Sequence, residues 1–178
     1  RIGTLESGNE VVAVVLKPVH APFSASDPAE LVLALDGIAD PGNMGTVLRI
    51  ADWFGVRRVL CSPDSVDEFN PKCVQASMGA ILRVEVHRHE LSAKLDELRA
   101  GGATIYLASM EGASVFDSAL RTPAILVLGS EAHGVSKAIR DRGGELISVP
   151  RFGGAESLNV AMAASALCME FTRQRLAR

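Results

Sequence analysis

The chain has 178 residues, of which 48% are hydrophobic, and a formal net charge of −3 at pH 7. This length and composition predict one folded domain and exclude an intrinsically disordered protein. The charge excludes a uniformly basic surface, so any contact with a nucleic acid would come from local arginine clusters. No apolar run reaches membrane-spanning length.

Residues 1–30 have the composition of a lead-in or linker. The apolar run from Val11 to Leu16 is broken by Pro18 and Pro22, and residues 24–28 are polar and proline-containing. The compact domain is therefore predicted to cover residues 31–178.

The three cysteines share no metal-ligand spacing, which predicts free, buried thiols in a reducing compartment. The N-terminus lacks the pattern of a signal peptide, so a cytoplasmic protein is expected. His87 and His89 could form a metal or phosphate patch, but a solvated strand end is the favoured interpretation, and no metal is predicted. The cysteines are Cys61, Cys73 and Cys168.

Apolar, strand-like runs alternate with helical patterns along the domain. Such alternation predicts an α/β fold with a mostly parallel sheet covered by helices on both faces. The predicted strands are residues 31–36, 57–61, 84–88, 104–110, 124–129 and 146–150.

Four helices are predicted between and after these strands. One follows Asn43 and places apolar residues toward the core, with Arg49 on its opposite side. A second covers residues 90–100, and a third begins after Ser136 as its N-cap. The last, residues 160–171, is apolar all round, which predicts a position in the core or against a second subunit. Three methionines are predicted to pack in the core: Met78, Met162 and Met169.

The common nucleotide-binding and hydrolase motifs are absent. The chain contains no G-x-G-x-x-G between a strand and a helix, no G-x-x-x-x-G-K-[ST] and no G-x-S-x-G. A dinucleotide-binding fold, a P-loop NTPase and the usual serine hydrolase are therefore unsupported.

Three other motifs occur in order: N-x(5)-R from Asn43 to Arg49, L-G-S-E-x-x-G over 128–134, and V-P-x-x-G-x-x-x-S-L-N over 149–159. With the segment NPKCVQASMGAI (70–81), they resemble the SpoU family of RNA ribose 2′-O-methyltransferases of the SPOUT class. The resemblance spans roughly residues 31–172. Residues 1–20 resemble the segment that joins this catalytic domain to a small N-terminal RNA-binding domain, which is expected to be missing here.

The resemblance implies a deep trefoil knot in the C-terminal part of the sheet, with S-adenosyl-L-methionine held by three loops around residues 107–110, 128–131 and 147–158. It also implies a homodimer formed through the C-terminal helix region and a tRNA or rRNA substrate. The cofactor-binding residues expected from it are Leu107, Ala108, Gly129, Val149 and Leu158.

The same resemblance assigns the catalytic role to Asn43, Arg49, Glu131, Ser157 and Asn159. Arg49 is expected to grip the target phosphate and orient the hydroxyl, because a guanidinium forks around phosphate and resists deprotonation. Proton acceptance by Arg49 is the alternative. Read singly, Asn43, Ser157 and Asn159 could each be only helix caps.

Two departures from the family pattern concern the substrate side. Gln75 stands where many members have Arg, and Arg151 and Phe152 follow Pro150 where Met and a variable residue are common. Gly153 and Gly154 are expected to let the backbone approach the cofactor. Two alternatives stay open: a non-catalytic RNA-binding relative, and an unrelated α/β enzyme that uses another nucleotide.

Overall fold

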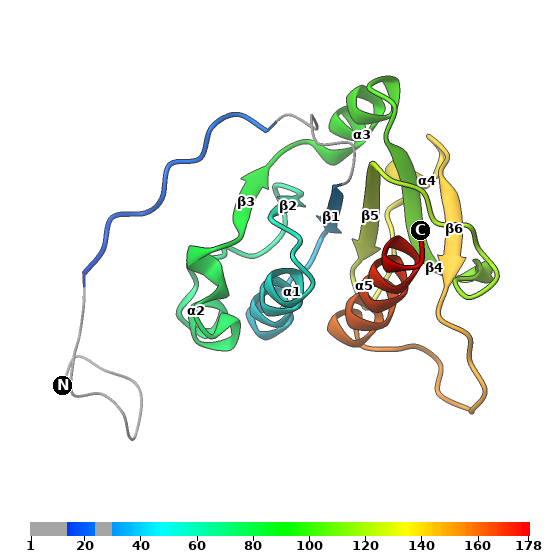
Figure 1. Cartoon of the computed structure of the whole chain (residues 1–178). Coiled ribbons are helices and arrows are strands. Elements are labelled where there is room, and N and C mark those ends of the chain that lie inside the picture. Colours follow the sequence, from blue (N-terminus) through cyan, green and yellow to red (C-terminus); the bar gives the residue numbers. More distant parts are fainter. Residues whose placement is uncertain (1–13, 24–29) are drawn as a thin grey trace.

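The computed structural model describes residues 14–23 and 30–178, and these residues form one sheet with helices packed on it (Figure 1). Within this part of the chain the sheet has six strands in the order β3-β2-β1-β5-β4-β6. The strands are β1 Leu31–Asp36, β2 Arg58–Cys61, β3 Glu85–Arg88, β4 Thr104–Ser114, β5 Ala124–Gly129 and β6 Glu145–Ser148. The helices are α1 Pro41–Trp53, α2 Pro71–Ser77, α3 Leu91–Ala100, α4 Lys137–Arg140 and α5 Val160–Leu176, with a 3-10 turn, η1, at Ala80–Leu82.

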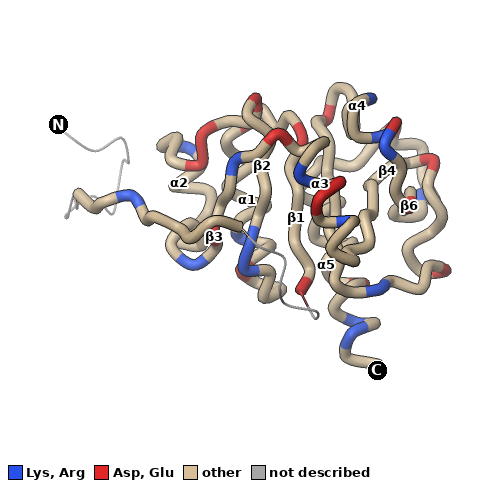
Figure 2. Tube along the Cα trace, turned by 90° about the horizontal axis from the view of Figure 1, so that it is seen from above, with Lys and Arg blue, Asp and Glu red and all other residues tan. Residues whose placement is uncertain are grey.

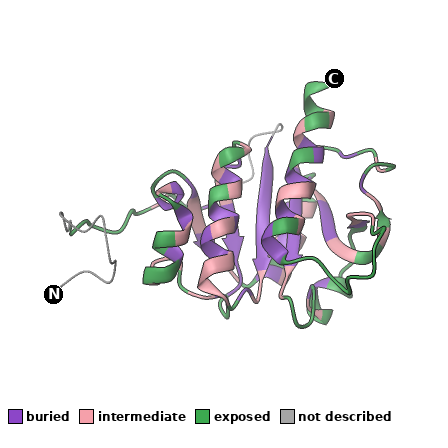
Figure 3. Ribbon diagram, turned by 90° about the horizontal axis from the view of Figure 1, so that it is seen from below, coloured by how far each residue is buried: buried purple, intermediate pink, exposed green. Residues whose placement is uncertain are grey.

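Both faces of the sheet are covered, as the near-continuous apolar strands predict. All five strand pairings are parallel. Along β1, Leu33 and Leu35 pack in one buried cluster with side chains of α1, α2 and α5, whereas Val32 and Ala34 pack in another with α3 and α4. Figure 3 shows the central strands of the sheet buried, and in β1 every residue except Asp36 is buried. The predicted α/β class and parallel sheet are confirmed.

The predicted strand bounds are accurate in the centre of the sheet and less so at its β4–β6 edge. β1 and β5 match their predictions, but β4 runs to Ser114 and β6 ends at Ser148. Ala108 and Ala113 both align with Ile147, so residues 109–112 bulge out of the ladder and β4 resumes beyond them. A period-two pattern cannot show such a bulge.

Asp40, not Asn43, caps helix α1. The Asp40 side chain accepts a hydrogen bond from the Asn43 backbone N–H over 2.8 Å, and Pro41 occupies the first helical position. The interpretation of Asn43 as a mere cap is therefore wrong, and its side chain is left for other contacts. Asn159 does cap α5, accepting from the N–H groups of Ala161 and Met162, whereas Ser157 lies outside that cap.

The prediction that the three methionines pack in the core is wrong. Met162 and Met169 are 57% and 63% exposed on α5, and Met78 is 68% exposed at the end of α2. α5 buries one side, which includes Ala164, Leu167 and Phe171, against the sheet and leaves the other side open. Composition alone could not distinguish a buried helix from one with a second apolar face.

The cysteines are free and buried, as predicted. Burial raises the pKa of Cys61 and Cys168 to about 12 and that of Cys73 to about 11, so all three thiols stay protonated and unreactive near neutral pH. None of the helices in the described part is both long and apolar enough to cross a membrane.

The predicted lead-in lies only partly within the described residues, because residues 1–13 and 24–29 fall outside them. His20 and Phe23 pack against His87, with ring centroids 5.6 Å apart in both pairs. His87 is consequently buried, and its interpretation as part of a solvated strand end is wrong. The lead-in segment thus contacts the domain beside β3 through His20 and Phe23.

Candidate active site

A pocket of about 620 Å³ opens beyond the carboxyl ends of β4, β5 and β6. Its lining comes mainly from three segments, 107–111, 129–135 and 146–158, together with Arg140 of α4 and three side chains of α5. The order of the strands changes direction next to the pocket. From β1 the chain continues to β2 and β3 on one side of β1, and β5 lies on the opposite side of β1. Open α/β sheets bind ligands at such a switch of strand order.

Two glycines allow the loops of the pocket to come this close together. A Cβ on Gly129 would lie 1.9 Å from the carbonyl carbon of Gly134, and one on Gly112 would lie 2.5 Å from the Ile147 nitrogen. Residues 129–135 therefore fold back on themselves, and the bulge of β4 lies directly on the β6 backbone. Gly153 and Gly154 differ, because a Cβ on either would meet nothing within 4 Å.

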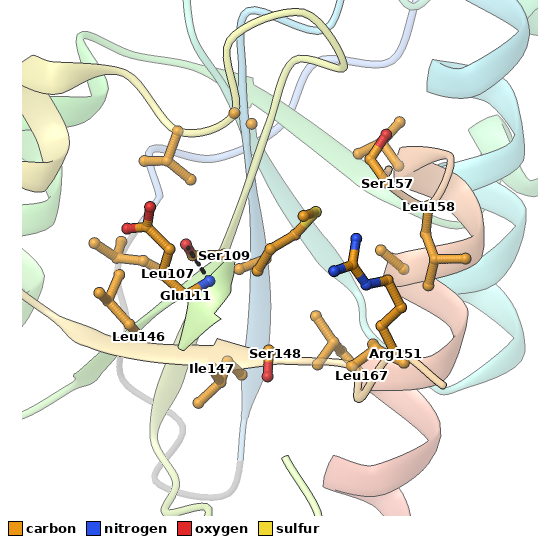
Figure 4. Close-up of a pocket in the computed structure, with 18 of the residues that line it drawn as sticks. Leu107, Ser109, Glu111, Leu146, Ile147, Ser148, Arg151, Ser157, Leu158 and Leu167 are labelled. Atoms are coloured by element: carbon orange, nitrogen blue, oxygen red, sulfur yellow. Dashed lines mark hydrogen bonds between the residues drawn. The ribbon is translucent and has the colours of Figure 1, made fainter. Parts of the chain in front are cut away.

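All five predicted cofactor residues line this pocket: Leu107, Ala108, Gly129, Val149 and Leu158. Figure 4 shows Leu107 and Leu146 on one side of it and Leu158 on the other. Mostly apolar walls with a few polar groups, here including Ser109 and Ser148, are typical of small-molecule sites of this size.

A chain of side-chain hydrogen bonds joins three of the predicted catalytic residues. The Asn43 amide donates to Glu131 Oε1, and the Asn159 amide donates to Asn43 Oδ1 over 3.0 Å. Glu131 and Ser157 line the pocket, Asn43 holds Glu131 from α1, and Asn159 holds Asn43 from the start of α5. The arrangement fixes one carboxylate at the mouth of the pocket.

Arg49 is not brought into this group. It is exposed on α1 and is absent from the residues that line the pocket. Its position six residues after Asn43 places it about 9 Å further along the helix axis and on another side of the helix. Its predicted role therefore requires a substrate that reaches beyond the pocket.

The sequence prediction missed Glu111 of the pocket, and it considered Arg140 and Arg151, which also line the pocket, as RNA contacts and not as pocket residues. In Figure 4 the Arg151 side chain points into the pocket, and its Nη1 donates to the Ala155 carbonyl over 3.1 Å. Glu111 directly follows the predicted strand 104–110, so its place at a strand's carboxyl end is a usable signal. Arg151 enters the sequence prediction as a departure from the family pattern and as one of several arginines considered as contacts to the RNA backbone.

In the described part of the chain, Lys and Arg positions are interspersed with Asp and Glu positions along the backbone (Figure 2). Several exposed arginines that could have served as RNA contacts are engaged in ion pairs: Arg83 with Asp52, Arg88 with Glu68 and Arg142 with Asp96. In the described residues no group of three or more His, Cys, Asp or Glu side chains is arranged to hold a metal ion.

Comparison with known proteins gives a consistent result. Residues 30–169 match the model of the SpoU rRNA Methylase family. The 23S rRNA (guanosine(2553)-2′-O)-methyltransferase RlmP of Bacillus subtilis is 32% identical over 163 residues, which are 91% of this chain and 64% of that protein.

Two solved structures are similar over the same region. A putative RNA methyltransferase of the TrmH family from Porphyromonas gingivalis has a TM-score of 0.78 and 43% identity, over 83% of this chain and 61% of that one. The SpoU methyltransferase AviRb from Streptomyces viridochromogenes, in complex with AdoMet, has a TM-score of 0.78 and 30% identity, over 85% of this chain and 63% of that one. The chain thus spans about three fifths of the length of these relatives.

Proposed function

Because the chain belongs to the SpoU rRNA methylase family, we propose that it transfers the methyl group of S-adenosyl-L-methionine to a ribose 2′-hydroxyl of rRNA or tRNA. The observation that carries this proposal is the position of the Asn159–Asn43–Glu131 hydrogen bonds at the mouth of a pocket lined by all five expected cofactor residues. The RNA substrate class follows from similar proteins that act on rRNA, RlmP among them.

The pocket fits S-adenosyl-L-methionine in size and in chemistry. Its volume lies within the range of sites that enclose small ligands. Leu107, Val149 and Leu158 supply apolar walls for an adenosyl group, and the loop around Gly129 brings backbone N–H and C=O groups close to its polar edge. Glu111 and Glu131 supply negative charge beside a cationic ligand. When bound, the cofactor supplies an electrophilic methyl group.

The residues of the chain then have to position the ribose hydroxyl and manage its proton. Glu131, held by Asn43, is placed to orient the groups around the hydroxyl, and Ser157 and Asn159 hold the loop and the ribose. Arg49 grips the phosphate of the target and orients the hydroxyl toward the methyl group. Fixed geometry of this kind supplies much of the rate enhancement of a transfer reaction.

The knotted topology is part of the proposal. Similar folds in the related structures support it.

A homodimer is proposed through the open side of α5. Met162 and Met169 are seven residues apart and face away from the sheet, so they form an apolar stripe that a second copy could cover.

We further propose that residues 1–30 link the catalytic domain of residues 31–178 to an RNA-binding domain, and that the protein acts in the cytoplasm on its RNA.

Calorimetry with S-adenosyl-L-methionine and S-adenosylhomocysteine tests the proposal first. Micromolar binding near one site per subunit is expected, followed by methyl transfer to unmodified rRNA or tRNA. A folded protein that binds neither compound would contradict the proposal. A protein that binds RNA but neither of these compounds would favour the alternative of a non-catalytic RNA-binding relative.

A further inference from the structure

Phe152 stands on the rim of the pocket with its ring in solvent. Its side chain is 94% exposed, yet it is among the residues that line the pocket. Isolated exposed apolar side chains are common on protein surfaces, so exposure alone identifies nothing. The position of Phe152 beside the proposed reaction site is what requires an explanation.

The loop around Phe152 is open to an incoming molecule. Residues 151–159 are all exposed, and a Cβ added to Gly153 or Gly154 would meet nothing within 4 Å. Arg151 precedes Phe152 and makes one hydrogen bond in the described part of the chain, to the Ala155 carbonyl. A guanidinium has five N–H donors, so most of its donors stay available.

We propose that Phe152 stacks on an RNA base at the methylated nucleotide or directly beside it, with Arg151 next to it contacting the RNA backbone. This inference rests on the proposed function, because a ribose that presents its 2′-hydroxyl at the pocket carries its base to the rim. Proteins recognise unstacked RNA bases by stacking them on aromatic side chains and on arginine. A flat ring that projects into solvent beside a cation has the chemistry for this contact.

A second subunit is the other possible occupant, and it is disfavoured by the position of Phe152. The apolar stripe proposed for the dimer, Met162 and Met169, lies on α5, whereas Phe152 is flanked by a charged residue and two glycines. Arginine and phenylalanine are common in protein interfaces as well, so the composition of this loop does not decide between the two occupants. The position of Phe152 favours RNA, because Phe152 lines the pocket that the substrate has to reach.

Tryptophan fluorescence gives a direct test. Trp53 is the single tryptophan of the chain, so Phe152→Trp in a Trp53→Phe background places one indole at the rim. This variant is titrated with unmodified 23S rRNA and tRNA transcripts in saturating S-adenosylhomocysteine, while filter retention measures binding of the same RNA. Stacking predicts that the indole emission is quenched as the RNA saturates. RNA binding without quenching would overturn the inference.

Affinity measurements on Phe152→Ala complete the test. Because Phe152→Ala removes the stacking of one base, its RNA affinity should be weaker than that of the wild type by about 5- to 150-fold. Phe152→Tyr keeps an aromatic ring, so its RNA affinity should be close to the wild-type value. Phe116→Ala is the matched control, because Phe116 is also exposed but does not line the pocket. S-adenosylhomocysteine affinity and the dimer mass are expected to stay unchanged.

The outcomes separate this inference from the proposed function. A wild-type protein that binds no S-adenosylhomocysteine refutes the proposed function, and the stacking role with it. Cofactor and RNA binding that are both insensitive to Phe152→Ala refute the stacking role alone. Dissociation of the dimer by Phe152→Ala would assign the residue to the subunit interface instead.

Discussion

The Asn159 amide donates a hydrogen bond to Asn43 Oδ1 over 3.0 Å, across 116 residues of chain. The same Asn159 side chain caps α5 through its Oδ1, so one residue fixes both the start of that helix and the orientation of Asn43. Asn43 in turn donates to Glu131. Three motifs that are remote in sequence therefore converge on a single carboxylate.

Asn43→Asp is expected to disrupt this arrangement, because it replaces the donor that faces Glu131 with a second carboxylate. Repulsion between the two would displace Glu131 from the mouth of the pocket. We expect methyl transfer to fall by about 10- to 100-fold, since small misplacements of a positioning group cost this much. Single-turnover rates at saturating cofactor measure the effect.

The double variant Asn43→Asp with Glu131→Gln provides the control. The amide introduced by Glu131→Gln could donate to the new carboxylate, which restores the hydrogen bond in the reverse direction. Thermal stability should return to the wild-type value while activity stays low, because the Glu131 charge is lost. Recovery of full activity would show that the charge of Glu131 has no role.

Arg49→Ala is expected to lower the rate of methyl transfer by roughly 100- to 1000-fold. Removal of one preorganised hydrogen-bond donor at a reacting group has an effect of this size. Because Arg49 does not line the pocket, the calorimetric affinity for S-adenosylhomocysteine should not change. Arg121→Ala is the matched control: Arg121 is also exposed, but it precedes β5 and so lies at the opposite end of the strands. An Arg49→Ala protein with normal turnover would remove Arg49 from the mechanism.

Much of the fold could be predicted because the strands β1 and β5 are buried on both faces and therefore apolar throughout. The polar cluster came from the family resemblance, since nothing in the local pattern at Asn43 indicates a partner 88 residues away. The β4 bulge and the exposure of Met162 and Met169 were missed for a physical reason. Both depend on what lies next to the segment in space, which hydrophobic periodicity does not encode.

Gly129→Ala is expected to be strongly destabilising, because its Cβ would overlap the Gly134 backbone. Backbone atoms cannot move aside as a flexible side chain can, so we expect a loss of about 3–5 kcal/mol. For a chain of this size the melting temperature should fall by roughly 10 °C. Calorimetry on any folded fraction should show no cofactor binding.

Gly153→Ala serves as the comparison, since an added Cβ there meets nothing within 4 Å. Its stability should lie within about 0.5 kcal/mol of the wild type. Equal effects of the two substitutions would show that the close approach at Gly129 has no structural importance.

Met169→Asp is expected to convert the proposed dimer into a monomer of 18.8 kDa. The charge would lie on the exposed apolar stripe of α5, where covering it by a second subunit requires its desolvation. Met78→Asp is the control, because Met78 is similarly exposed but lies at the end of α2. Light scattering coupled to gel filtration measures both masses. A wild-type protein that is itself monomeric would contradict the dimer proposal.

The carboxylate of Glu170 predicts a specific pH dependence of stability. It lies buried on α5, and hydrogen bonds from Arg173, at 2.7 Å, and from Gln174, at 2.8 Å, lower its pKa from 4.5 to about 2. Gln174 also donates to the Ser118 carbonyl, so the cluster joins α5 to the loop before β5. A depressed pKa in the folded state stabilises the protein fully above pH 4.5, and this contribution is lost as the pH falls toward 2.

Glu170→Gln should therefore lower the melting temperature at pH 7, and the difference from the wild type should shrink as the pH falls from about 4.5 to about 2. Asp117→Asn is the control, because the exposed Asp117 side chain lies outside this cluster. Calorimetric scans across this pH range measure the difference directly. A difference that stays constant from neutral to acidic pH would show that the stabilisation comes from packing of the side chain, and the charge of Glu170 would then have no part in holding α5 against the loop.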